Sequence, residues 1–206
     1  MEHRTVNARG KVRVMLMASP SPPPSHTHTR ARTRTAGFTA ILVVHRCAHG
    51  LAMAYDMDCM YAVGGYGGQG RYLDSVECLS VSAGTDARWL SLPPLSCKRA
   101  GCVAAVGPDR RVYCVGGGPD GQTAHRSMEA YDARTSTWDA SLTPPTIDRH
   151  YNAAAFGPDG RLYVSGAFRH TGQLDAVEAY DVRADRWETL PEIGVVVQFS
   201  AGAFLY

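Results

Sequence analysis

The sequence predicts an all-β protein built from repeated four-stranded antiparallel units. Two observations lead to this prediction. The segment RAGCVAAVGPDRRVYCVGGG, which starts at Arg99, aligns without a gap with RHYNAAAFGPDGRLYVSGAF, which starts at Arg149. The tryptophans Trp89, Trp138 and Trp187 are each 49 residues apart. A fixed period in this range is typical of stacked structural units that bury a common core.

The first copy contains YAVGGYGGQG, in which Gly65, Gly67 and Gly70 fit the Gly-x-Gly-x-x-Gly pattern of a dinucleotide-binding loop. That loop requires a helix directly after the glycines, because the N-terminal amides of the helix hold the phosphates. The following residues, RYLDSVECLSV, have no helical apolar stripe and alternate in part. They therefore predict a second strand.

Each copy is predicted to form four short strands. In the second copy these strands cover about Cys102–Val106, Arg111–Val115, Ser127–Tyr131 and Thr137–Ala140. The Gly-Pro-Asp sequences form tight turns between the first two strands, since proline fixes φ and glycine accepts a positive φ. The diglycines at the end of the second strand allow neighbouring backbones to approach. Repeated four-stranded units of this length are typical of a β-propeller.

The diglycines, and the six residues between Tyr131 and Trp138 and between Tyr180 and Trp187, resemble the kelch repeat. The MEAYD and VEAYD sequences most resemble the kelch part of BTB–kelch (kelch-like) adaptor proteins. Leu79 and Ala167 depart from the pattern, where the family has tyrosine and glycine. The resemblance implies a partial kelch-type β-propeller with three four-stranded antiparallel blades and the first strand of a fourth. The structural repeat residues are Gly64, Gly65, Gly116, Gly117, Gly166, Tyr131, Tyr180, Trp89, Trp138 and Trp187.

Two regions are expected. Residues 1–46 form a low-complexity, basic tail that we expect to be disordered. Residues 47–206 hold the repeats, with blades at about 47–95, 98–145 and 148–193 and the start of the next at 194–206. Because propellers close with about four to eight blades, we expect a fragment of a longer product. Self-association into a closed ring, or a non-functional truncated gene product, are the alternatives.

Charge is distributed unevenly along the chain. Residues 1–47 carry eight basic side chains and one acid, a balance of +7, whereas residues 48–206 carry thirteen basic and eighteen acidic, a balance of −5. An acidic body does not favour nucleic-acid binding. The apolar run at 37–44 is too short to cross a bilayer, which takes about 20 residues. We expect no nucleic-acid or membrane partner and a cytoplasmic location, with an organellar transit peptide in the Arg-rich tail as the alternative.

The sequence predicts no catalytic or metal-binding constellation. No Gly-x-Ser-x-Gly elbow and no zinc spacing is present, and Cys59, Cys78, Cys102 and Cys114 fall in predicted strands as buried small side chains. Disulfide or redox use of these cysteines stays open. Oxidases that share this type of propeller use a copper site with tyrosine and histidine ligands, and no such cluster is visible. We expect no enzyme, metal or cofactor; a galactose-oxidase-like or carbohydrate-binding propeller fragment is the alternative.

The resemblance implies a module that binds a protein or peptide ligand and recognises substrates within a cullin-based ubiquitin ligase adaptor. In such adaptors, ligands are contacted at the start of the innermost strand and in the loop after the diglycine. The matching positions are Arg99, Arg149, His150, Tyr151, Asn152, Tyr66, Gln69 and Arg71. Arginine suits carboxylate recognition. The repeated arginines have an alternative role, pairing with acids or carbonyls inside the blade. Glu77, Glu129 and Glu178 share one repeat position and are interpreted as structural.

Overall fold

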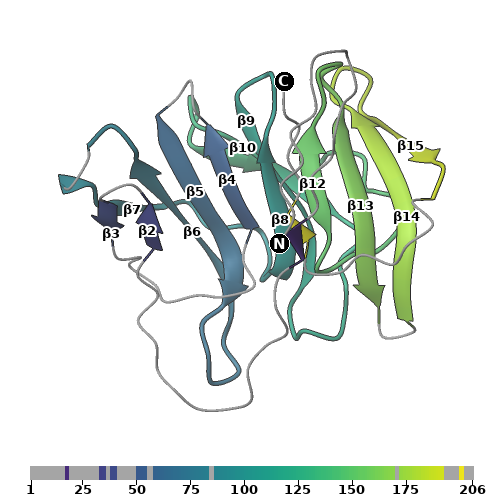
Figure 1. Cartoon of the computed structure of the whole chain (residues 1–206), viewed down its shortest axis with the longest axis horizontal. Helices are drawn as coiled ribbons and strands as arrows, with labels where there is room; N and C mark the ends of the chain where they lie inside the picture. Colours follow the sequence, from purple (N-terminus) through teal and green to yellow (C-terminus); the bar gives the residue numbers. More distant parts are fainter. Residues whose placement is uncertain are drawn as a thin grey trace, which may run out of the picture.

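The computed structural model describes residues 17–18, 33–35, 38–40, 50–54, 58–83, 86–169, 172–192 and 200–201. Three four-stranded antiparallel sheets dominate, each following chain order (Figure 1). We call them blades 1, 2 and 3. Blade 1 comprises β4 (Gly50–Ala54), β5 (Cys59–Tyr66), β6 (Tyr72–Ser80) and β7 (Trp89–Leu92). Blade 2 comprises β8 (Ala100–Val106), β9 (Arg111–Gly118), β10 (Met128–Asp132) and β11 (Thr137–Asp139). Blade 3 comprises β12 (Ala153–Phe156), β13 (Leu162–Arg169), β14 (Gly172–Asp181) and β15 (Arg186–Leu190).

This architecture confirms the predicted all-β, partial propeller. A strand, β6, follows Gly70, so the glycine pattern of the first copy precedes a strand and not a helix. The tryptophans occupy equivalent places in the outermost strands: Tyr131 pairs with Trp138 and Tyr180 with Trp187 across adjacent strands. In blade 1 the partner of Trp89 is Leu79. The pairing of the third strand with the fourth is therefore the same in all three blades, although blade 1 has Leu79 where the other two blades have a tyrosine.

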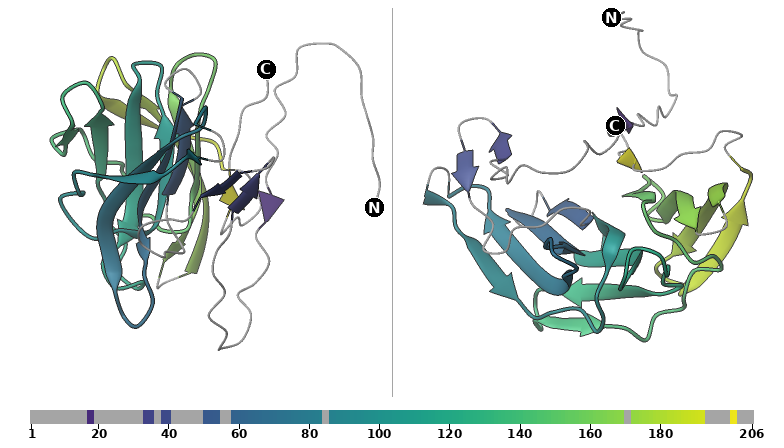
Figure 2. Two further views of the ribbon diagram at one scale, coloured as in Figure 1. Left: turned by 90° about the vertical axis from the view of Figure 1, so that its left-hand side faces the viewer. Right: turned by 90° about the horizontal axis from the view of Figure 1, so that it is seen from below.

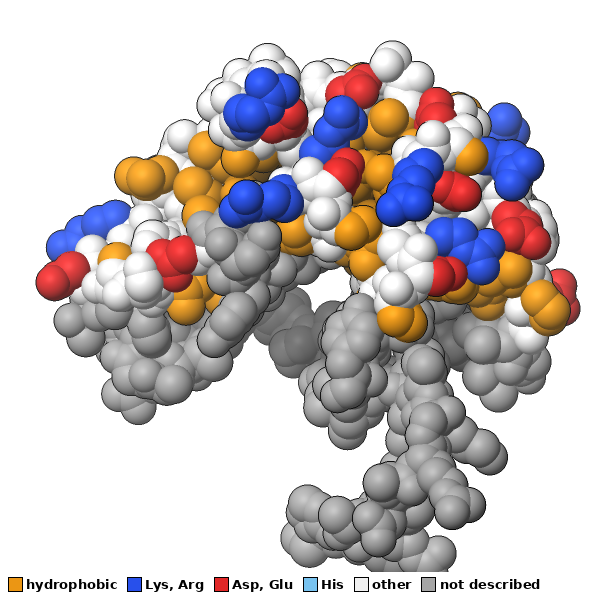
Figure 3. Space-filling view, turned by 90° about the horizontal axis from the view of Figure 1, so that it is seen from above, with side chains coloured by type: hydrophobic (Ala, Val, Ile, Leu, Met, Phe, Trp, Pro, Cys, Tyr) orange, Lys and Arg blue, Asp and Glu red, His pale blue; other side chains and the backbone are white. Residues whose placement is uncertain are grey.

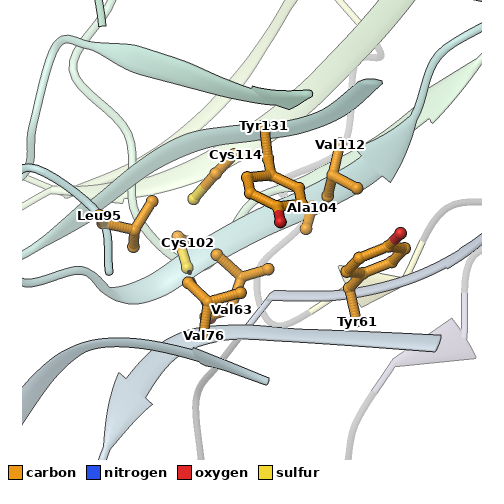
Figure 4. Close-up of a cluster of buried hydrophobic side chains, with 9 residues drawn as sticks. All are labelled: Tyr61, Val63, Val76, Leu95, Cys102, Ala104, Val112, Cys114 and Tyr131. Atoms are coloured by element: carbon orange, nitrogen blue, oxygen red, sulfur yellow. Dashed lines mark hydrogen bonds between the residues drawn. The ribbon is translucent and has the colours of Figure 1, made fainter. Parts of the chain in front are cut away.

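The blades follow one another along an arc, with an apolar core between each neighbouring pair (Figure 2). Between blades 1 and 2, the buried side chains include Tyr61, Val63 and Val76 from blade 1 and Cys102, Ala104, Val112, Cys114 and Tyr131 from blade 2 (Figure 4). Tyr113 and Tyr180 pack between blades 2 and 3, their ring centroids 6.2 Å apart. Aromatic side chains bury roughly 150–250 Å² each, so they dominate these interfaces.

The diglycines couple one blade to the next. Gly64 and Gly116 have positive φ angles of 61° and 68°. A Cβ atom on Gly116 would lie 2.2 Å from the carbonyl oxygen of Arg149, which precedes the innermost strand of the next blade. The amide of the second glycine, Gly117, donates a hydrogen bond of 2.7 Å to that same oxygen. Gly65 bonds the Arg99 carbonyl oxygen in the same way, at 2.8 Å. Glycine is required here because the neighbouring backbone occupies the space of a side chain.

The strand ends of blade 2 differ most from the predicted ends at the diglycine and at the start of the innermost strand. The diglycine was expected to end the second strand of blade 2, but β9 continues through Gly116 and Gly117 to Gly118. The innermost strand begins correspondingly earlier, at Ala100, which pairs with Gly118. Gly101 and Gly117 both have positive φ and are skipped in this pairing. The two strands therefore continue past these glycines in the same register.

Other predictions fall on regions that the structure describes only in part. Within 1–46 it describes three short strands: β1 (Met17–Ala18), β2 (Thr33–Thr35) and β3 (Phe38–Ala40). β2 pairs with β3, and β1 pairs with β16 (Ser200–Ala201). The disordered tail and the blade boundaries stay predictions, and most of 194–206 lies outside the described residues.

The four strand cysteines lie in β5, β6, β8 and β9, as predicted. Cys102 and Cys114 are buried, whereas Cys59 and Cys78 are half-buried. All five cysteines in the described part of the chain, which include Cys97, are free thiols. Cys47 lies outside the described residues.

Candidate functional site

Arg99, a predicted ligand residue, is buried inside blade 2. Its guanidinium lies 2.9 Å from the carboxylate of Glu129 on β10, and each side chain is 1% exposed. The same guanidinium donates to the Gly116 carbonyl oxygen at 2.9 Å and to the Ser127 hydroxyl at 2.8 Å. A buried charge needs such a complete set of partners. The placement favours the alternative in which the repeated arginine holds the blade together.

Arg149 repeats this arrangement in blade 3. Its Nη2 lies 2.8 Å from Glu178 Oε2, with both side chains fully buried. Nη1 donates to the carbonyl oxygens of Gly166 and Ala176 at 2.7 and 3.0 Å. Glu77 occupies the same repeat position in blade 1 and is 1% exposed. The repeated acids are therefore internal to the blades.

The paired glutamates also fix the linkers that join the blades. The carboxylate of Glu129 accepts a hydrogen bond from the Ser96 amide at 2.9 Å. Glu178 accepts one from the Thr146 amide at 2.8 Å. The tryptophans bind the same linkers. Trp138 Nε1 donates a hydrogen bond to the Pro93 carbonyl oxygen, and Trp187 Nε1 donates one to that of Thr143, both at 2.9 Å. Each linker thus lies against the blade that it precedes, which sets where the innermost strand starts.

The connections that follow β5 and β9 project from the same end of the sheets, at the bottom of Figure 1. We call residues 66–71, 97–98 and 119–126 the loop face. In the first loop, Tyr66 and Tyr72 have ring centroids 5.1 Å apart, and the Gly70 amide donates to the Tyr66 hydroxyl at 3.0 Å. Gln69, with a positive φ of 51°, and Arg71 are exposed. The loop therefore presents these two polar side chains to solvent.

The loop of blade 2 lies beside the linker before β8. Its Asp120 accepts hydrogen bonds from the amides of Thr123 and Gln122, and those bonds lower the pKa of Asp120 below the ordinary 3.8. His125 Nε2 bonds the Lys98 carbonyl oxygen at 3.1 Å. Partial burial lowers the pKa of His125, so its imidazole is neutral at neutral pH. The hydrogen bonds to Asp120 thus fold this part of the loop into a turn.

His150, Tyr151 and Asn152 directly precede β12, the innermost strand of blade 3. His150 is fully buried, with its ring centroid 4.9 Å from that of Tyr151. Tyr151 is half-buried and adopts a φ of +54°, whereas the equivalent residue of blade 2 is Gly101, at +69°. Asn152 is 5% exposed, and its side-chain amide has no hydrogen-bond partner among the residues that the structure describes. The left-handed Tyr151 is strained relative to glycine.

The predicted site residues therefore divide into two groups. Tyr66, Gln69, Arg71 and Tyr151 reach the surface, whereas Arg99, Arg149, His150 and Asn152 are buried. The assignment of the surface group to ligand binding stays a prediction. Lys98, His125 and Arg126 also lie on the loop face and were not among the predicted ligand residues. For His125 and Arg126 a signal was present in the sequence, because the loop after the second diglycine has the same place in its repeat as the loop after the first.

At the end of the molecule opposite to the loop face, basic and acidic side chains are interspersed over the described surface (Figure 3).

Among the described residues, no group of three or more histidine, cysteine or acidic side chains is placed to hold a metal ion. In that same part of the chain, no helix has the length and apolarity of a membrane span. The expectation that the protein is not an enzyme and needs no cofactor stays a prediction.

Comparison with known proteins finds a family model that matches the repeats. Residues 47–96 and 99–140 match the model of the Kelch motif. The chain is 29% identical over 148 residues to Kelch-like protein 41a of Danio rerio, covering 71% of this chain and 23% of that protein. It is 26% identical over 144 residues to Kelch repeat and BTB domain-containing protein 8 of Homo sapiens, covering 48% and 24%. An F-box/kelch-repeat protein of Arabidopsis thaliana is 29% identical over 135 residues, covering 61% and 37%.

The chain thus spans between 23% and 37% of the length of these relatives. Among solved structures, that of YjhT resembles it with a TM-score of 0.62 at 15% identity. The likeness covers 74% of this chain and 53% of YjhT, and it concerns the fold alone.

Proposed function

Because this chain is a kelch-repeat protein with a partial β-propeller, we propose that its loop face binds a short acidic or polar segment of a protein partner. Kelch repeats form rigid scaffolds for protein interaction, and rigid scaffolds carry recognition on their loops. The observation that carries the proposal is that the linker before β8 is bonded both to the loop of blade 2 and to the start of β6, directly after the first loop. His125 of the blade 2 loop bonds the backbone of Lys98, and the amide of the adjacent Arg99 bonds the carbonyl oxygen of Leu73 in β6 at 3.0 Å.

Charge supports the acidic ligand. Arg71, Lys98 and Arg126 are exposed on this face, one from each of its three segments. Asp120, the acidic residue of the loop face, uses its carboxylate within its own loop, where it accepts hydrogen bonds from the amides of Gln122 and Thr123. The basic groups therefore meet an incoming carboxylate with little internal competition, and arginine can bind it through two N–H groups.

The wider role we propose is substrate recognition within a cullin-type ubiquitin ligase adaptor. Support comes from the relatives, whose names include BTB and F-box domains beside kelch repeats. The test is co-precipitation of a cullin with the full-length gene product from cells. Absence of any cullin from the captured proteins would overturn this role and leave peptide binding intact.

Peptide binding is tested directly with an arrayed library of short acidic, basic and polar peptides. We expect acidic sequences to bind the 206-residue chain, and the double variant Arg71→Glu/Arg126→Glu to weaken that binding by about tenfold or more. The matched control is Arg134→Glu, which reverses a charge that is 82% exposed in the turn between β10 and β11, away from the loop face. Equal binding by both variants would contradict the proposal.

A further inference from the structure

His125 lies where the loop of blade 2 meets the linkers before β8 and β12. Its imidazole Nε2 bonds the Lys98 carbonyl oxygen, in the first of these linkers, at 3.1 Å. Its backbone amide donates to the Gly117 carbonyl oxygen at 2.7 Å, and its own carbonyl oxygen accepts from the Arg149 amide at 3.4 Å. Contacts with three different segments therefore set the position of this ring on the loop face.

The bond to Lys98 determines which ring nitrogen of His125 carries the proton. A carbonyl oxygen only accepts, so Nε2 is the donor, and in the neutral ring Nδ1 carries the lone pair. Nδ1 has no hydrogen-bond partner among the described residues, yet it is not one of the buried atoms that lack a partner. The half-buried ring thus presents one basic nitrogen to solvent.

The surroundings of the ring oppose its protonation in the free protein. Burial lowers the pKa of His125 from its usual 6.5 and the Arg99 guanidinium lowers it further, whereas the bond to Lys98 and the charges of Asp120 and Glu129 act in the opposite direction. Both of these carboxylates are already engaged, Glu129 with Arg99 and Asp120 with the amides of its own turn. The imidazole is therefore neutral at neutral pH.

An acidic ligand changes this balance. Lys98 and Arg126 are adjacent to the ring and exposed, whereas the guanidinium of Arg149 is engaged with Glu178. A carboxylate held by the exposed cations and placed at Nδ1 favours the charged ring, because a nearby opposite charge raises the pKa of a base. We propose that His125 binds the carboxylate of the ligand through Nδ1 as an imidazolium, so that binding takes up a proton and tightens as the pH falls. This inference rests on the proposed binding of an acidic segment by the loop face.

The direction of the pH dependence follows from linkage. The free chain protonates His125 with a pKa below 6.5, and the bound chain protonates it at a higher pH. Binding takes up a proton between the two pKa values, and the affinity rises as the pH falls through that window. The side-chain carboxylates of the ligand have ordinary pKa values of about 4 and stay ionised there.

The test is titration calorimetry of the 206-residue chain with an end-blocked peptide of aspartate and glutamate residues. Measuring the heat near neutral pH in two buffers of different ionisation enthalpy gives the proton uptake. We expect uptake, and an affinity that rises about threefold to tenfold from pH 8 to pH 6. His125→Gln removes the titrating group but keeps an amide that can donate to the Lys98 carbonyl oxygen, and we expect it to abolish the uptake. Arg134→Glu, on the exposed turn between β10 and β11, is expected to keep it.

Nuclear magnetic resonance titration of the histidine ring protons gives an independent measurement on the unsubstituted chain. We expect the pKa of His125 to rise by about one unit when the peptide is bound. An unchanged pKa overturns the inference, and so does uptake that persists in His125→Gln, because another group then takes the proton. Peptide binding without uptake refutes the role of His125 and leaves the proposed function intact. Absence of binding at every pH refutes both.

Discussion

Arg149 and Glu178 form a fully buried ion pair, with Nη2 and Oε2 2.8 Å apart, that joins the start of one strand to the middle of another two strands away. The same pairing recurs in blade 2 between Arg99 and Glu129. In both blades the carboxylate also holds the backbone of the preceding linker. The ion pair therefore helps to determine how each blade is connected to the one before it.

Arg149→Met is expected to lower the free energy of unfolding by about 3–5 kcal/mol, because it leaves the Glu178 carboxylate buried without its cation. Arg161→Met is the matched control. Arg161 pairs with Asp159 and Glu188 at 2.8 and 2.9 Å, but these groups are a third to more than half exposed. We expect that loss to stay below about 1 kcal/mol. Urea unfolding followed by tryptophan fluorescence measures both, and similar losses would contradict the structural role of the buried pair.

Gly116→Ala is expected to destabilise the chain far more than Gly70→Ala. Both glycines have positive φ, 68° and 74°, so the backbone strain of alanine, about 1–2 kcal/mol, is common to both. Only at Gly116 does the new Cβ meet the Arg149 carbonyl oxygen at 2.2 Å; nothing lies within 4 Å of one on Gly70. The difference between the two variants in the free energy of unfolding, measured by chemical denaturation, gives the cost of this steric contact. If Gly116→Ala is no worse than Gly70→Ala, blades 2 and 3 do not approach as described.

Acidification is expected to destabilise blade 3 through His150. Burial lowers the pKa of His150 from its usual 6.5, with the charges of Asp148 and Asp120 opposing the shift. The unfolded chain therefore binds the proton more readily than the folded chain. The stabilisation is present above pH 6.5 and is lost as the pH falls through the lower pKa of the folded state.

His150→Ala should remove this part of the pH dependence, since Ala100 fills the equivalent position of blade 2. His125→Ala is a comparison variant, because His125 is less buried and lies on a loop. Thermal melts between pH 5 and 8, the range in which histidine titrates, provide the measurement. A His150→Ala variant that keeps the full acid sensitivity would refute this assignment.

Trp138→Phe and Trp187→Phe are each expected to lower the free energy of unfolding by about 1–3 kcal/mol, since each removes an indole hydrogen bond to a linker carbonyl and part of a packed ring. Trp138 is half-buried and Trp187 is 8% exposed, so the loss at Trp187 should be the larger. Differential scanning calorimetry of both variants compares them. A negligible loss at either position would mean that the linkers are not held as the structure indicates.

The strand arrangement could be predicted because the copies repeat at nearly constant spacing. That repetition identified the places of the tryptophans, the tight turns and the diglycines. The sequence could not decide the role of Arg99 and Arg149, since an arginine before a strand serves a carboxylate ligand and an internal acid equally well. Glu129 and Glu178 lie about thirty residues downstream, and only the sheet register brings each to its arginine.

The residues that break the repeat were the least predictable. Asn152 takes the place of Cys102, whose thiol donates to the Val63 carbonyl oxygen across the blade boundary, yet the larger amide makes no equivalent bond. The left-handed conformation of Tyr151 was hidden because only its glycine equivalent signals it. Such positions depend on the exact separation of two blades, which no local pattern encodes.

A crystal structure of the chain tests the central claim most directly: that its repeats form equivalent sheets coupled by the same contacts. The account predicts that blades 2 and 3 superpose with the guanidinium groups of Arg99 and Arg149 on common positions, each against its buried glutamate. It also predicts the carbonyl oxygen of Arg149 within hydrogen-bond distance of the Gly117 amide. A helix after Gly70, or either arginine directed into solvent away from its glutamate, would contradict it.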